Sequence, residues 1–203
     1  MRQSAGTEAG SERASGFVAV DERMVGELTA PRPSRLFTDA VTNYFLKIDG
    51  IEGGSIDTTH LNEIEILSYT WGVHATGLLE NAKVSHVATP TDVSFTKLLD
   101  RSSPKLAAAV TTGQHLQSAV LTSRRTAKDL PYLKITLTNV LVTNYVLAAS
   151  AGGYPDDQFS LNFGKIQVEY LRLKADGTPD TPVGFIWDVV TAKGHNPAAQ
   201  GGL

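Results

Sequence analysis

The chain has 203 residues, with 18 basic and 21 acidic side chains and a formal net charge of −3. This balance provides no basic field for nucleic acid, and no stretch approaches the roughly 20 apolar residues of a membrane helix. Because the chain contains no cysteine, disulfides and Cys-ligated metal sites are excluded.

Residues 1–41 differ in composition from the rest of the chain. They are rich in Ser, Gly, Ala, Glu and Arg and show no sustained hydrophobic period, so we expect an N-terminal extension, either an arm or a flexible segment. The apolar run at 17–20 is too short for the core of a signal peptide, and we expect no cleaved signal peptide. Met1 and Met24 are the only methionines, which makes Met24 an alternative start.

From Thr42 onward the hydrophobic pattern has mainly a period of two, which predicts β-strands. In three segments the apolar parity changes partway along, near Leu67, Asn139 and Gly164. Such a change turns side chains to the opposite face and is typical of β-bulges, which bend long strands. Bends favour a curled or closed antiparallel β-barrel, because closure needs strand tilt and bending. The alternative is that both faces of each strand are buried, one of them in a subunit interface.

Two connections between the predicted strands carry distinct signals. Asp176-Gly177 separates a long strand from the last one, which predicts a hairpin. Residues 72–92 form a connection longer than an ordinary hairpin loop, and long loops in compact domains usually serve function. It contains Leu78 and Leu79, and apolar loop tips seldom remain in water. We therefore expect a protruding loop that docks on a partner; the alternative is that the pair folds back on its own barrel.

A short helix is predicted over residues 104–112. Pro104 suits the first helical position, where its missing N–H would be unpaired anyway, and Ser103 is expected to cap the first turn. Gly113 can adopt the left-handed conformation that ends a helix. The small Ala-rich face indicates close approach to a neighbouring surface, either the chain's own sheet or another subunit.

Motifs for catalysis and for metal binding are missing from the sequence. The five histidines do not have the spacing of metal ligands on one helix, and there is no Gly-x-Ser-x-Gly elbow. The glycines within 50–54 lack the Lys-Ser/Thr of a phosphate-binding loop. Arg124 and Arg125 end a strand and form too small a basic cluster for nucleic acid. We therefore expect neither an enzyme nor a cofactor or metal site.

Several segments form a recognisable series when taken in order. The strand near 64–72 ends in Tyr-Thr-Trp-Gly, and the strands at 132–142 and 160–170 follow the predicted helix. The most specific segments are Phe45-Leu46-Lys47-Ile48-Asp49-Gly50-Ile51-Glu52-Gly53 and Phe95-Thr96-Lys97 followed by Asp100 and Ser103-Pro104. In this order and spacing they resemble the haemolysin-coregulated protein family, the tube proteins of bacterial type VI secretion systems.

The resemblance extends from about Thr42 to about Val190. It implies a tube domain at 42–192, which we expect to be followed by a C-terminal tail at 193–203. The N-terminal extension at 1–41 is a departure from the family, whose core does not include it. The fold that the resemblance implies is a mainly β, phage tail-tube-like barrel with one short flanking helix.

The family also implies an assembly. Hexameric rings of the chain with itself would stack into a hollow tube, which sheath, spike and baseplate proteins propel into target cells and which carries small effector proteins in its lumen. The subunit would assemble in the bacterial cytoplasm and then be secreted to the extracellular space or a target cell. The alternatives are the inner tube of a related phage-like contractile injection particle and a soluble ligand-binding β-barrel.

Two groups of residues are candidates for the contacts within such an assembly. A stack of rings needs one lateral interface that closes and one axial interface that does not. The expected ring-stacking residues lie in the long connection: Gly72, Thr76, Gly77, Leu78, Leu79, Glu80, Asn81 and Lys83. The expected lateral-contact residues lie on the helix: Pro104, Lys105, Ala108, Ala109 and Thr112.

Overall fold

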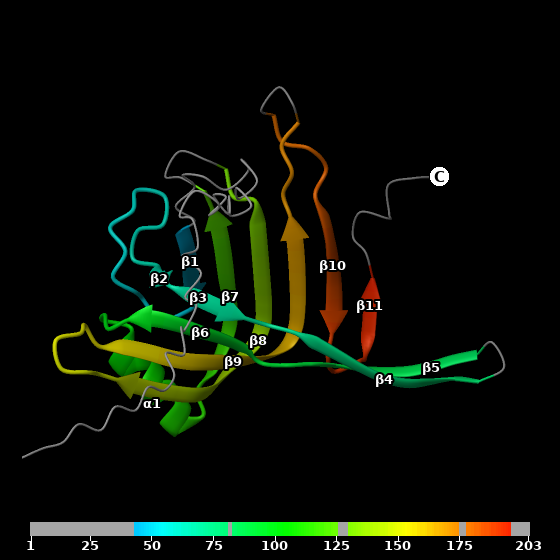
Figure 1. Ribbon diagram of the computed structural model, residues 1–203, viewed down its shortest axis with the longest axis horizontal. Coiled ribbons are helices and arrows are strands. Elements are labelled where there is room, and N and C mark those ends of the chain that lie inside the picture. Colours follow the sequence, from blue (N-terminus) through cyan, green and yellow to red (C-terminus); the bar gives the residue numbers. More distant parts are fainter. Residues whose placement is uncertain (1–42, 81–82, 126–129, 175–177, 196–203) are drawn as a thin grey trace, which may run out of the picture. The chain divides into compact units, whose positions relative to one another are not determined.

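The computed structural model describes residues 43–80, 83–125, 130–174 and 178–195, as shown in Figure 1. The expected extension at 1–41 and the Asp176-Gly177 turn lie outside these ranges. The elements of the described residues, in chain order, are β1 (Asn43–Ile48), β2 (Ile64–Ile66), β3 (Ser68–Thr70), β4 (Val73–Glu80), β5 (Lys83–Pro90), β6 (Val93–Leu98), α1 (Ser103–Thr112), β7 (His115–Arg124), β8 (Leu133–Ala148), β9 (Asp156–Tyr170), β10 (Val183–Asp188) and β11 (Lys193–His195). The prediction of a mainly β fold with one short helix is confirmed.

Nine strands form one antiparallel sheet around the two long strands β8 and β9. The main path runs β11-β10-β9-β8-β7-β1-β2, and β6 pairs with the first half of β9 and with β3. β2 and β3 are separated by Leu67 alone, whose N–H donates to the Thr96 carbonyl at 2.8 Å. The parity change predicted at Leu67 is therefore confirmed as the point where the chain leaves β1 and joins β6.

In both β8 and β9 the buried side chains switch to the other parity partway along the strand, and the two switches lie opposite each other. Leu137 and Val140 are buried while Asn139 between them is exposed and has a φ of 57°. Gly164 lies opposite, and a Cβ added there would be 3.1 Å from the Asn139 Cβ. The predicted parity changes in both strands are confirmed, and Figure 1 shows β9 turning along its length.

The core is formed by apolar side chains that point inward from the strands and from α1. Phe95 and Phe159 are directly opposite on β6 and β9, with their ring centroids 5.1 Å apart. Leu106 and Ala109 of α1 are fully buried in the same cluster. The helix is thus held by its own subunit's core, which a helix of this length requires. No helix among the described residues is long and apolar enough to cross a membrane.

The helix α1 starts one residue earlier than predicted. Ser102 occupies the N-cap position, and no side chain caps the first turn, so the prediction that Ser103 caps the helix is wrong. The Ser103 oxygen instead accepts from the Lys97 ammonium at 2.9 Å and from the Asp100 N–H at 3.1 Å, while its hydroxyl proton is donated to the buried Asp157 carboxylate. Gly113 ends the helix with a φ of 63°, as predicted.

The segment predicted as a long loop is a β-hairpin. β4 and β5 pair in continuous register from Val73 opposite Pro90 to Glu80 opposite Lys83. They form a two-stranded sheet of their own, and neither pairs with any other strand of the described chain. The loop prediction was wrong because alternation of apolar residues appears only when one strand face is buried, and the side chains of β4 from Val73 to Gly77 are exposed on both faces.

Candidate functional site

The β4–β5 hairpin brings most of the expected ring-stacking residues together. Gly72 lies at its base, where Thr91 N–H donates to the Gly72 carbonyl at 2.9 Å. The following expected residues lie along β4 and at the start of β5: Thr76, Gly77, Leu78, Leu79, Glu80 and Lys83. Asn81 lies outside the described residues.

The hairpin exposes apolar side chains near its base. Val87 of β5 is 65% exposed and Val73 of β4 is 47% exposed. Both backbone edges of this two-stranded ribbon lack a further strand within the described part of the chain. Unpaired edges and exposed apolar residues are features of surfaces that dock on another chain.

The expected lateral-contact residues divide into two groups on α1. Pro104, Lys105, Ala108 and Thr112 are exposed, and the Thr112 hydroxyl donates to the Ala108 carbonyl at 2.8 Å. Ala109 is fully buried in its own core. Only the four exposed residues are therefore accessible to a second subunit.

A buried charge network lies under the start of α1. Lys97 is fully buried, and its Nζ lies 2.7 Å from an Asp157 carboxylate oxygen and 2.8 Å from one of Asp100. The Lys97 ammonium also donates to the Ser103 hydroxyl at 2.9 Å. Asp157 is fully buried as well and accepts a hydrogen bond from the Tyr145 hydroxyl at 3.2 Å. Burial and the Asp157 charge raise the pKa of Tyr145, which keeps it a donor.

The network joins four parts of the fold. Asp100 accepts the N–H groups of Gly54 and Ser102, each at 2.8 Å. With Lys97 on β6 and Asp157 on β9, these bonds tie two strands, the helix start and the loop after β1 together. Sequence reasoning missed the network, although Lys97 follows Val93 and Phe95 at the spacing that points inward.

The Asp100 carboxylate predicts an acid-sensitive contribution to stability. Burial disfavours its charged form, but hydrogen bonds from Lys97 and Ser102 outweigh burial and hold the pKa of Asp100 below its ordinary value. A carboxyl with a lowered folded-state pKa stabilises the fold above its unfolded pKa and loses that effect as pH falls through the folded pKa.

We therefore expect Asp100→Asn to flatten the acid side of the stability profile. Between about pH 5 and pH 2, urea unfolding should show that the free energy of unfolding falls more steeply with decreasing pH in the wild type than in the variant. Equal slopes in the two proteins would contradict this role of Asp100.

An uncharged polar face covers the outer side of the sheet around β6. Directly opposed pairs on adjacent strands place these side chains together: Ser94 with Ser160, whose hydroxyls are 3.0 Å apart, and Thr96 with Gln158. The members of this polar face are Ser68, Thr70, Ser94, Thr96, Asn144, Gln158, Ser160 and Asn162. Sequence reasoning did not single out these residues, since neutral polar residues on alternate strand positions are also the pattern of any solvated sheet.

The two arginines at the end of β7 have different surroundings. Arg124 is buried, with its guanidinium carbon 4.7 Å from the centre of the Phe45 ring, and it pairs with Asp57. A hydrogen bond from Thr59, followed by those from Arg124 and the backbone, holds the pKa of Asp57 well below its usual range. Arg125 is exposed. Among the described residues no group of three His, Asp or Glu side chains is placed to hold a metal ion.

Comparison with known proteins gives one consistent result. The family described as "Type VI secretion system effector, Hcp" matches residues 45–170. Protein hcp1 of Pseudomonas aeruginosa is 36% identical over 151 residues, which cover 71% of this chain and 93% of that protein. The crystal structure of Hcp1 from Salmonella typhimurium superposes with a TM-score of 0.64 at 31% identity, covering 76% of this chain and 99% of that one. A type VI secretion system effector from Yersinia pestis gives a TM-score of 0.60 at 30% identity, with 72% and 99% coverage.

Proposed function

Because the chain belongs to the Hcp family of type VI secretion system proteins, we propose that it is a structural subunit of a secretion tube. In this proposal six subunits form a ring, and rings stack into a hollow tube. The observation that carries it is the β4–β5 hairpin, a ribbon with exposed apolar residues at its base and, within the described ranges, no other strand paired to it. Such a hairpin fits a subunit whose unpaired strand edges and exposed apolar residues are covered by other copies of the same chain.

The subunit fold proposed for this tube is a closed, tail-tube-like barrel. Two observations support closure: β2 and β3 are separated by a single residue, and they pair with β1 and β6 respectively. If β2 and β3 are treated as one continuous strand with a bulge at Leu67, the hydrogen-bonded path leads from β1 through that strand to β6, β9, β8 and β7. It then returns to β1, as in a closed barrel.

Two kinds of interface follow from a stack of rings. The lateral contact must close after six subunits, and the axial contact must remain open to the next ring. The exposed residues of α1, together with strand edges, are proposed for the lateral contact. The β4–β5 hairpin is proposed for the axial contact.

The polar face is proposed to line the channel of the tube. Its hydroxyl and amide groups carry no charge of their own, and the Asp92 carboxylate at its border accepts a hydrogen bond from Asn162 at 2.7 Å. The face therefore offers little fixed charge to attract or repel a passing protein. This supports transport of small effector proteins through the lumen.

The remaining parts of the proposal follow the tube function. Sheath, spike and baseplate proteins are the expected partners, and no catalytic role is proposed for the subunit. Assembly would take place in the bacterial cytoplasm, followed by export into the medium or a target cell without a cleaved signal peptide. Residues 1–41 are proposed as an arm outside the tube domain of 42–192, and 193–203 as a tail that starts with β11.

Placing charge on the hairpin is expected to separate ring formation from stacking. Replacing Leu78 and Leu79 together with Asp should leave rings intact and abolish tubes, because a desolvated carboxylate in the axial contact would be strongly unfavourable. Electron microscopy of the concentrated protein measures both states. The matched control replaces the same two residues with Val and should still form tubes. Tubes unchanged in the Asp variant would show that the hairpin is not the axial contact.

A further inference from the structure

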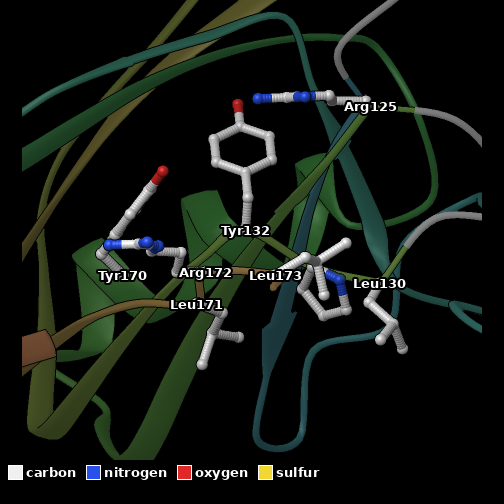
Figure 2. A pocket seen from close by; sticks show the side chains of 8 residues that line it. Arg125, Leu130, Tyr132, Tyr170, Leu171, Arg172 and Leu173 are labelled. Atoms are coloured by element: carbon white, nitrogen blue, oxygen red, sulfur yellow. The ribbon is translucent and has the colours of Figure 1, made fainter. Parts of the chain in front are cut away.

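A small cavity lies at the end of the sheet where β7, β8 and β9 meet their connections. One wall is the segment before β8, and the other is the segment after β9; the Leu171 N–H donates to the Tyr132 carbonyl at 2.8 Å and joins them. The cavity has a volume of about 270 Å³ and is shown in Figure 2. It is lined by Arg125, Leu130, Pro131, Tyr132, Tyr170, Leu171, Arg172 and Leu173.

Two arginines supply hydrogen-bond donors to this cavity. The Arg125 guanidinium carbon is 5.9 Å from the centre of the Tyr132 ring, and Figure 2 shows the guanidinium near the hydroxyl end of that ring. The Arg125 side chain is exposed, so its planar fork of N–H groups is accessible to a carboxylate. Arg172 lies on the opposite wall, near Tyr170 in the same view.

A carboxylate of the chain itself already lies close to one arginine. An Asp180 oxygen is 3.6 Å from Arg172 Nε, and both side chains are partly exposed. An exposed pair at this distance contributes little and exchanges readily with another anion. The geometry thus accepts a carboxylate at Arg172, with Asp180 as a weak competitor.

The rest of the cavity is apolar and faces water. Leu130 is 51% exposed, Leu173 is 45% exposed and Tyr170 is 49% exposed. Apolar side chains gathered beside two cations fit a ligand that carries a carboxylate on an aliphatic or aromatic group, because such a ligand covers the apolar surface and pairs with the arginines at once.

We propose that this cavity is a binding site for a carboxylate attached to an apolar group. The chemistry is shared by free organic acids and by an acidic residue next to an apolar one in an extended peptide. This site is separate from the hairpin, the helix and the polar face, and the proposal does not depend on tube formation.

The test uses N-acetyl-leucine and N-acetyl-leucinamide, which differ only in the carboxylate. Ligand-observed NMR with the full-length protein should detect the acid with a Kd on the order of 1–10 mM and the amide at least tenfold more weakly. A terminally blocked Leu-Asp dipeptide tests the peptide source: binding at similar strength assigns the site to acidic side chains as well as to free acids, and no binding restricts it to free acids.

Variants connect the binding to these residues. Arg125→Gln and Arg172→Gln should each raise the Kd of N-acetyl-leucine at least fivefold, while Asp180→Asn should lower it by removing the competitor. Lys47→Gln serves as the control and should have no effect on the Kd. Lys47 is exposed and lies near the end of β1 that is farther from Arg125. Arg125 and Arg172 are exposed, and unchanged melting temperatures would show that the variants fold. Equal binding of acid and amide, or unchanged affinity in both arginine variants, would overturn the proposal.

Discussion

Replacing Lys97 with Met is expected to lower the free energy of unfolding by about 3–5 kcal/mol. Lys97 is fully buried and is within 2.8 Å of carboxylate oxygens from both Asp100 and Asp157. Methionine is similar in length but carries no charge, so the variant would leave the fully buried Asp157 carboxylate and the partly buried Asp100 carboxylate without their cation. Breaking a buried ion pair on one side is costly because the remaining charge has lost its water and its partner.

Chemical denaturation at neutral pH measures this effect. The control is Lys105→Met on the exposed side of α1, which should change the free energy of unfolding by no more than about 0.5 kcal/mol. Adding Asp157→Asn to Lys97→Met should recover part of the loss, because it removes one of the two unpaired charges. A Lys97→Met protein within about 1 kcal/mol of the wild type would show that the network does not stabilise the fold.

Truncating Phe159 to Ala is expected to cost about 3–5 kcal/mol of unfolding free energy. Its ring is 1% exposed and stacks on Phe95 of the neighbouring strand. Removal of the ring would forfeit both the buried apolar area and the cross-strand contact, and would leave a cavity that the rigid sheet cannot fill.

The neighbouring residue gives the control for this truncation. Gln158 lies one position before Phe159 on β9 and points to the opposite, exposed face. Gln158→Ala should stay within about 0.5 kcal/mol of the wild type in the same denaturation experiment. Similar losses in both variants would contradict the assignment of the two faces of β9.

The bends of the sheet could be predicted from the sequence because each strand has one buried face. Inward residues such as Leu137 and Val140 are apolar and outward ones are polar, so the change of parity at Asn139 is visible in the order of residues alone. The helix could be placed for a similar local reason, since Pro104 and Gly113 mark its two ends.

Other elements could not be found in this way. The side chains of β4 from Val73 to Gly77 are exposed on both faces, so this part of the hairpin lacks the alternation on which prediction depends. β11 spans only three residues and is defined by its pairing with β10. The prediction of a Ser103 cap failed because the Lys97 ammonium and the Asp100 N–H donate to the same hydroxyl oxygen.

The candidate sites also divide into those formed by neighbours in sequence and those formed by distant segments. The expected stacking residues are neighbours in sequence, and those that the structure describes lie on one hairpin or at its base. The arginine cavity combines residues 125–132 with 170–173, and the charge network combines Lys97 with Asp157, so each requires the fold to bring distant segments together. Only the inward spacing of Lys97 after Phe95 was a local signal.

Electron microscopy of the purified full-length protein tests the tube proposal most directly. Rings of six subunits are expected in dilute samples, and stacked rings or tubes in concentrated ones. A strictly monomeric protein at high concentration would contradict it.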